Sequence, residues 1–315
     1  MIRRPGVTLM EVLIAMFIMA IGMMALLALF PVGAVSMAQA LKDDRCAYAS
    51  IVSENTAIAS NIRYGDWAVT TPLNAAAAGS ATGLGMVFVD PYGVQNGLLT
   101  PLGAPVVMNI LRVSPSFASP ASPTNPTGIP VTVPPVLPSY VTDRWFSLPD
   151  DIGYNLGGYP DIVTTGGVLD RGRRYSLAYL LRKQLSIQVT PTPFANANQI
   201  PVQLYAVVYS GRPVFSLATT PGEHLLQGGT PVPPNSIRLP GVGLQGLKRG
   251  GWVFEPDNGY FYRVTNIAEN PAANTTSVEF QQNLRGASPT PIAITRIIGM
   301  DYVAEVFDKG TGWQQ

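Results

Sequence analysis

The sequence predicts an α+β protein in which one long N-terminal helix precedes a large, antiparallel β-rich head. Two observations lead to this fold class. Residues 12–41 contain no charged side chain over thirty positions, which suits one long apolar helix. Beyond residue 65, short segments rich in Val, Ile, Tyr and Phe alternate with Gly, Asn and Pro turns, without strand–helix–strand alternation. The chain therefore combines a helix with a separate sheet.

The first half of the predicted helix, residues 7–41, is long enough to cross a membrane. Thirty helical residues span roughly 45 Å, whereas a hydrocarbon core is about 30 Å thick. Arg3 and Arg4 precede the apolar run and favour a cytoplasmic N-terminus, so the head is predicted to be exported. The alternatives are a plain membrane anchor and a secretory signal peptide cleaved after Ala38-Gln39-Ala40, although signal cores have only about 7–15 apolar residues.

Glu11 stands at the front edge of this apolar run. A carboxylate in hydrocarbon costs a few kcal/mol on insertion scales and marks a functional site by default. No residue within the apolar run can compensate its charge. The partner of Glu11 is therefore predicted to lie outside this chain.

The segment Gly6-Val7-Thr8-Leu9-Met10-Glu11-Val12-Leu13-Ile14-Ala15 resembles the cleavage and methylation motif of type IV prepilins and type II secretion pseudopilins. Through Gly22 it is most similar to minor pilins of the pilus-modification type. The resemblance covers about forty residues and implies a pilin-like fold with a leader at residues 1–6. It implies cleavage after Gly6, N-methylation of Val7, and neutralisation by Glu11 of a neighbouring subunit's N-terminal amine. Val7 departs from the family's usual phenylalanine.

The same resemblance implies partners and a location. The partners are other pilin or pseudopilin subunits, met through the N-terminal helix, together with prepilin peptidase and an inner-membrane assembly platform. The chain is then a single-pass inner-membrane protein with a cytoplasmic N-terminus and a periplasmic head, which can end in a cell-surface filament. Pro31 and Gly33 mark where such a helix can loosen, with a static kink as the alternative.

Residues 42–64 are predicted to continue the helix as an amphipathic segment that lies against the head and ends near Gly65. Cys46, the single cysteine, is interpreted as a small packing residue. The residues that recur at helical spacing, and so form the predicted apolar face, are Leu41, Tyr48, Ile51, Val52, Ile58, Ala59 and Ile62.

The head, residues 65–315, is predicted to contain strands at Val106–Val113, Tyr175–Arg182, Leu185–Thr190, Val202–Ser210, Trp252–Glu255, Tyr260–Ile267, Ser277–Leu284 and Ile292–Phe307, the last of these as more than one strand. Turns are expected at Ser210-Gly211, Gly250-Gly251, Asp257-Asn258-Gly259 and Gly166-Gly167. Residues 115–149 hold nine prolines and are predicted to form an extended loop.

The sequence predicts neither an enzyme nor a cofactor. The net charge of +1 gives no attraction to nucleic acid. His224 is the single histidine and is placed in a Pro/Gly-rich loop without zinc-ligand partners nearby in the sequence. Residues 241–246 match the glycine spacing of a dinucleotide fingerprint, but its strand, turn and helix are judged to be missing. Asp150, Asp151 and Asp161 are weak calcium candidates, for which turn capping is the preferred interpretation.

Two classes of function follow. The first is a structural filament subunit, a minor pilin or pseudopilin, assembled through the N-terminal helix. The second is a membrane-anchored exported binding protein or enzyme unrelated to filaments. Glu11 distinguishes them, because a simple anchor gains nothing from an acid in its apolar helix.

Overall fold

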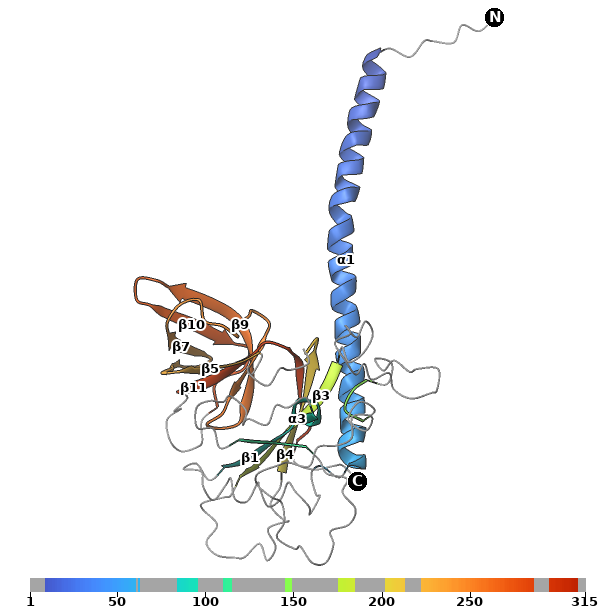
Figure 1. Ribbon diagram of the computed structural model, residues 1–315. Coiled ribbons are helices and arrows are strands. Elements are labelled where there is room, and N and C mark those ends of the chain that lie inside the picture. Colours follow the sequence, from blue (N-terminus) through green and yellow to red (C-terminus); the bar gives the residue numbers. More distant parts are fainter. Residues whose placement is uncertain are drawn as a thin grey trace, which may run out of the picture. The chain divides into compact units, whose positions relative to one another are not determined.

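A computed structural model describes residues 9–60, 62, 84–95, 110–114, 145–148, 175–184, 202–212, 222–285 and 295–310 (Figure 1). The chain divides into two compact units, Met1–Tyr48 and Ala49–Gln315. One helix, α1, runs from Leu9 to Ala59. The predicted combination of a long N-terminal helix with a β-rich head is therefore confirmed.

The first unit contains most of α1. Its residues 9–27 and 29–44 are exposed to solvent although nearly all of those before residue 42 are apolar. By length and composition α1 can cross a membrane. The helix passes through Pro31 and Gly33 without a break in its helical assignment.

The second unit contains two sheets. The first has five strands in the order β12-β4-β3-β1-β2. Their bounds are β12, Val303–Asp308; β4, Val202–Ser210; β3, Tyr175–Gln184; β1, Leu84–Val89; and β2, Leu111–Val113. The pair β1–β2 is parallel, with the short helix α3 (Pro91–Gln95) between the two strands in the sequence. The other pairs are antiparallel.

The second sheet has seven antiparallel strands in the order β5-β11-β8-β9-β10-β7-β6. Their bounds are β5, Glu223–Gln227; β11, Arg296–Met300; β8, Trp252–Glu255; β9, Tyr260–Asn270; β10, Thr275–Phe280; β7, Ser236–Pro240; and β6, Thr230–Val232. The two edge strands, β5 and β6, are consecutive in the sequence and separated only by Gly228 and Gly229. Such a short connection brings the edges together, so we call this element the rolled sheet.

Three apolar clusters hold the second unit together. Successive strand residues lie on opposite faces of the five-stranded sheet. Tyr179 belongs to the cluster that includes Ala57 near the end of α1, whereas Leu180 belongs to the cluster shared with the rolled sheet. The cluster between the sheets includes Phe88 and Phe254. A third cluster fills the rolled sheet with residues such as Tyr262, Val278 and Ile297. The five-stranded sheet is thus covered on both faces.

The rolled sheet is a contiguous insertion. It lies in the sequence between β4 and β12, which are hydrogen-bonded neighbours in the five-stranded sheet. The chain leaves and returns at adjacent points, because Asp301 N donates to Gly222 O at 2.8 Å and Ser210 N donates to Tyr302 O at 2.8 Å. No pattern in the sequence predicts this arrangement.

The predicted strands at 202–210 and 252–255 are observed at those bounds, and those beginning at 175 and 260 extend further than expected. The last predicted segment is two strands, β11 and β12, as expected. Residues 281–284 are not the end of a strand: β10 ends at Phe280, where its register with β9 shifts, and residues 281 and 282 form a bend. Of the segment 106–113 only 111–113 is a strand among the described residues, and 185–190 lies outside them.

The predicted apolar face of residues 42–64 is wrong for most of its members. Tyr48, Ile51, Ile58 and Ala59 are exposed, whereas Ile62 is buried. Small residues occupy the buried positions of the second unit's helical turns, namely Ala49, Ser53, Thr56, Ala57 and Ser60. The cause is close packing, since small side chains let the backbone of α1 approach the sheet. Cys46 is buried, as a packing residue should be.

Candidate assembly site

The candidate site lies at the start of α1. Gly6 and Val7, the predicted cleavage and methylation positions, lie outside the described residues, which begin at Leu9. Glu11 is in the first turn of the helix. There its carboxylate lies near the positive end of the helix dipole, which favours a negative charge.

The side chain of Glu11 borders a shallow groove on the helix surface. The groove has a volume of about 470 Å³ and is otherwise lined by Val12, Ala15, Met16 and Met19. These positions recur every three to four residues and so share one side of the helix. The site therefore combines one acidic group with an apolar strip that includes two flexible methionines, which suit contact with varied partners.

The apolar surface beyond this groove is extensive. Leu13, Phe17, Ile21 and Leu26 are each more than half exposed, and the remaining large apolar residues from Leu9 to Leu41 are also exposed. Soluble monomers rarely expose so large a contiguous apolar area. Lipid or other apolar helices must cover it.

Pro31 and Gly33 are both within the uninterrupted helix. Apart from the adjoining residues and the backbone of α1 itself, no atom lies within 4 Å of the position that a Cβ would take at Gly33, so close packing in the described residues does not require a glycine there. The predicted flexibility at these two positions stays a prediction.

The remaining candidates are the calcium candidates and His224. Asp150, Asp151 and Asp161 lie outside the described residues. Within the described part of the chain, no three His, Cys, Asp or Glu side chains are grouped to hold a metal ion.

His224 is in strand β5, not in a loop as predicted. Its Nε2 is 2.9 Å from Asp301 Oδ2, and Lys248 Nζ is 2.9 Å from Asp301 Oδ1. Burial opposes ionisation of Asp301, but hydrogen bonds from Lys248 and His224 outweigh it and lower the pKa of this carboxyl. Residues 241–246 directly follow strand β7, so the prediction that no strand precedes this segment is wrong. The segment itself forms turns and bends and does not begin a helix. It therefore lacks a dinucleotide-binding geometry.

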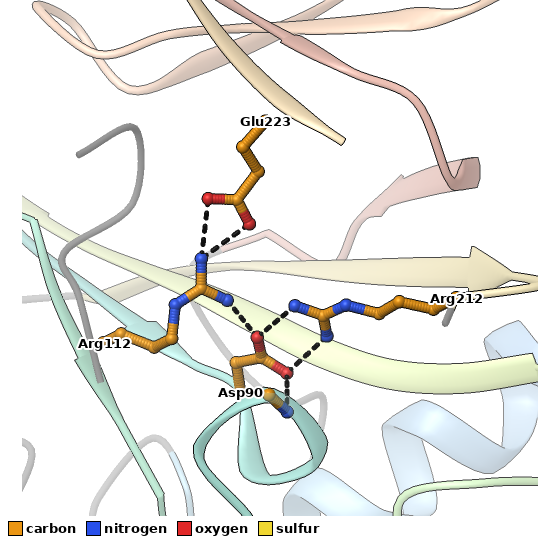
Figure 2. A network of polar contacts seen from close by, with 5 residues as sticks. Asp90, Arg112, Arg212 and Glu223 are labelled. Carbon is orange, nitrogen blue, oxygen red and sulfur yellow. Dashed lines mark hydrogen bonds and ion pairs between the residues drawn. The ribbon is translucent and has the colours of Figure 1, made fainter. Parts of the chain in front are cut away.

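Sequence reasoning missed a buried charge network at the junction of the two sheets (Figure 2). Asp90 follows β1, Arg112 is in β2, Arg212 follows β4, and Glu223 begins β5. Arg212 donates to both carboxylate oxygens of Asp90 at 2.6 and 2.7 Å, and Gly93 N donates to it at 2.9 Å.

Arg112 links the two acids of this network. It donates to Asp90 and, through Nη2, to both oxygens of Glu223 at 2.6 and 2.8 Å. Burial alone raises the pKa of Asp90, but the charges of Arg212 and Arg112 outweigh it and hold that pKa well below its usual range. The network joins the two sheets. Its four side chains are almost inaccessible to solvent, so they offer no surface for a ligand.

A second missed group is Glu255 at the end of β8. Burial raises its pKa to about 8, although Asn258 donates two hydrogen bonds to Oε1 at 2.6 and 2.9 Å. Glu255 directly follows the apolar residues 252–254 of β8, and a charged residue at the end of such a strand is the sequence signal that could have found it.

Comparison with protein families gives one match. Residues 1–27 match the prokaryotic N-terminal methylation motif, which is characteristic of type IV prepilins and pseudopilins. The match includes Gly6, Val7 and Glu11. No curated protein and no solved structure matches the chain.

Proposed function

We propose that this chain, which carries the methylation motif of type IV prepilins and pseudopilins, is a minor pilin or pseudopilin. In this proposal it is a structural, non-catalytic subunit of a type IV pilus or of a type II secretion-like filament. The observation that carries the proposal is the exposed apolar surface of α1 with Glu11 in its first turn.

The physical argument joins the helix with the motif. The motif implies processing by a prepilin peptidase and assembly with other pilin subunits. Cleavage after Gly6 would place a new amine at Val7, four residues before Glu11. In a filament the amine of a neighbouring subunit would then neutralise the Glu11 carboxylate. An apolar environment strongly disfavours either charge alone.

The proposed location follows from the charges that flank the helix. Arg3 and Arg4 precede the apolar run and favour a cytoplasmic N-terminus, which places the β-rich head on the periplasmic side of the inner membrane. The assembly platform in that membrane then moves the processed subunit into the filament. In a pilus the head would reach the cell surface.

Processing gives the test. We expect the mature chain to begin with an N-methylated Val7 and to be recovered in sheared filaments, as shown by mass spectrometry of the N-terminal peptide. A Gly6→Val variant should stay full-length in the membrane, because the larger side chain blocks cleavage. A Gly6→Ala variant is the matched control and should keep more processing than the valine variant, because its side chain stays small.

Two results would contradict the proposal. A mature chain that begins at Leu41 would establish a secretory signal peptide. A full-length wild-type chain found only in membranes would establish a simple anchored protein.

A further inference from the structure

The turn between β8 and β9 follows a buried acid whose two oxygens have different surroundings. Glu255, the last residue of β8, is fully buried. Its Oε1 accepts two hydrogen bonds from Asn258, one from the backbone N at 2.9 Å and one from Nδ2 at 2.6 Å. Its Oε2 is buried as well, but it has no hydrogen-bond partner among the described residues. An ionised carboxylate in this position would keep part of its charge in a dry site without a donor, which costs free energy.

A second acid in the same turn lacks a donor too. Asp257 Oδ1 accepts hydrogen bonds from Arg296, whereas Asp257 Oδ2 is buried and has no hydrogen-bond partner in the described part of the chain. The charge of Asp257 acts on Glu255 and disfavours a second negative charge beside it. A proton on Glu255 removes that second charge and makes Oε2 a donor. One proton would therefore meet the needs of both acids.

Charged and titratable groups also face Glu255 from neighbouring strands. Arg182 in β3 attracts its ionised form, and Tyr262 in β9 lies close enough to be affected by its charge. Arg182 already donates to Gln203 Oε1 and to Tyr260 Oη, each at 3.1 Å. Burial outweighs the attraction of Arg182 and raises the pKa of Glu255 from an ordinary value near 4.5 to about 8. The surroundings therefore favour the protonated acid at neutral pH.

The same turn is a contact between the two sheets. Gly259 has a φ of 71°, and a Cβ at this position would lie 2.5 Å from Met86 Sδ and 3.1 Å from Arg182 Cδ. Met86 is in β1 and Arg182 is in β3, so the turn packs directly on the five-stranded sheet. Asn258, which donates to Glu255, immediately precedes Gly259. The protonation of Glu255 therefore acts at the joint between the sheets.

We propose that Glu255 and Asp257 share one proton, and that this proton holds the turn at residues 256–259 in place on the five-stranded sheet. Loss of the proton to solvent leaves two neighbouring carboxylates, one of them fully buried, and the turn then opens so that water can reach them. The joint between the sheets is firm in acid and loosens as the solution becomes alkaline. This inference does not depend on the proposed role in a filament.

The direction of the pH effect follows from proton binding. In the folded head Glu255 keeps its proton up to about pH 8, but in an open turn it releases the proton near pH 4.5. A group whose pKa is raised in this way contributes stability that is complete below pH 4.5 and is lost as the pH rises through about 8. Because opening releases one proton in this window, each pH unit favours the open turn by up to about tenfold.

Hydrogen exchange of the full chain in detergent tests the inference. In wild type, the protection factors of residues 252–264 should fall by more than about tenfold between about pH 5 and pH 8. Glu255→Gln has the shape of the protonated acid and offers an N–H to Asp257, so its protection should not fall over this range. Glu279→Gln is the matched control, because Glu279 is an exposed acid in β10, and it should behave like wild type.

Infrared spectroscopy of the wild type gives a second measurement that needs no variant. A band from a protonated carboxyl group should be present at about pH 7, where ordinary carboxyl groups are ionised, and should disappear in alkaline solution. Without this band the inference is wrong, even if Glu255→Gln fails to fold.

Two further results would overturn the inference. The first is an equal pH dependence of protection in wild type and Glu255→Gln. The second is protection at alkaline pH that calcium restores, because the two acids would then hold a metal ion instead of a proton. None of these measurements involves filaments, so the proposed function is decided separately.

Discussion

At the scale of single residues, the buried charge network around Asp90 connects the two sheets of the head. Asp90 accepts hydrogen bonds from Arg112, Arg212 and Gly93 in a site from which water is excluded. Removing one partner from such a buried pair leaves an uncompensated charge. The network is therefore expected to matter for stability and not for assembly itself.

Asp90→Asn should lower the free energy of unfolding of the head by about 3–5 kcal/mol, because two buried guanidinium groups then share the single charge of Glu223. The measurement is denaturant unfolding of the full chain in detergent, followed by tryptophan fluorescence. Glu54→Gln is the matched control. The Glu54 side chain is 44% exposed and its ion pair with Lys309, at 2.9 Å, lies near the surface, so the loss should stay within about 1 kcal/mol. Equal effects of both variants would refute the structural role of the network.

The residues of the assembly site were predictable from the sequence, whereas those of the charge network were not. Glu11 stands out because an acid borders thirty residues without charge. Asp90 and Glu223 are separated by more than a hundred residues, and only the fold brings them to Arg112. Sequence patterns report local surroundings, so a contact of that sequence separation left no local signature.

At the scale of secondary structure, α1 shows where hydrophobic periodicity misleads. Ile51 and Ile58 recur at helical spacing and were assigned to the face that contacts the head. The structure buries Ala49 and Ala57 there instead. Periodicity identifies an apolar face, but it does not tell a face that is buried within the chain from one that stays exposed.

This packing predicts that leucine substitutions at two neighbouring alanines change the free energy of unfolding by different amounts. Ala57 is fully buried between α1 and the five-stranded sheet, whereas Ala59 is exposed two residues later. Ala57→Leu should overpack the interface and lower the free energy of unfolding by about 1–3 kcal/mol. Ala59→Leu, the control, should change it by less than about 0.5 kcal/mol, since both residues form helices well. Thermal or denaturant unfolding of both variants would decide, and a similar loss from each would contradict the packing described.

Only some of the strands could be predicted from the sequence. Strands β4 and β8, which are rich in Val, Tyr, Trp and Phe, were predicted at their observed bounds. Four others were missed, namely β1, β5, β6 and β7. Pro231 lies within β6, where an edge strand tolerates proline, and β7 has only two buried apolar positions. Strands β6 and β7 therefore depend on their neighbours for stability.

At the scale of the whole molecule, the methylation motif and the β-rich head occupy separate parts of the sequence. The N-terminal helix carries the motif for processing and assembly. The five-stranded sheet packs on the end of that helix, and residues 222–301 add the rolled sheet between β4 and β12. The fold class was predictable from composition and periodicity. The insertion was not, because it depends on which strands become neighbours.

The central claim is that the helix assembles through the acid in its first turn. The most direct measurement is the ratio of this chain in sheared filaments to that in membranes for wild type, Glu11→Ala and Glu11→Asp. We expect Glu11→Ala to be processed and inserted normally but sharply depleted from filaments, because the neighbouring amine loses its partner. Glu11→Asp should be intermediate, since it keeps the charge with a shorter reach. Equal incorporation of Glu11→Ala and wild type would contradict the account.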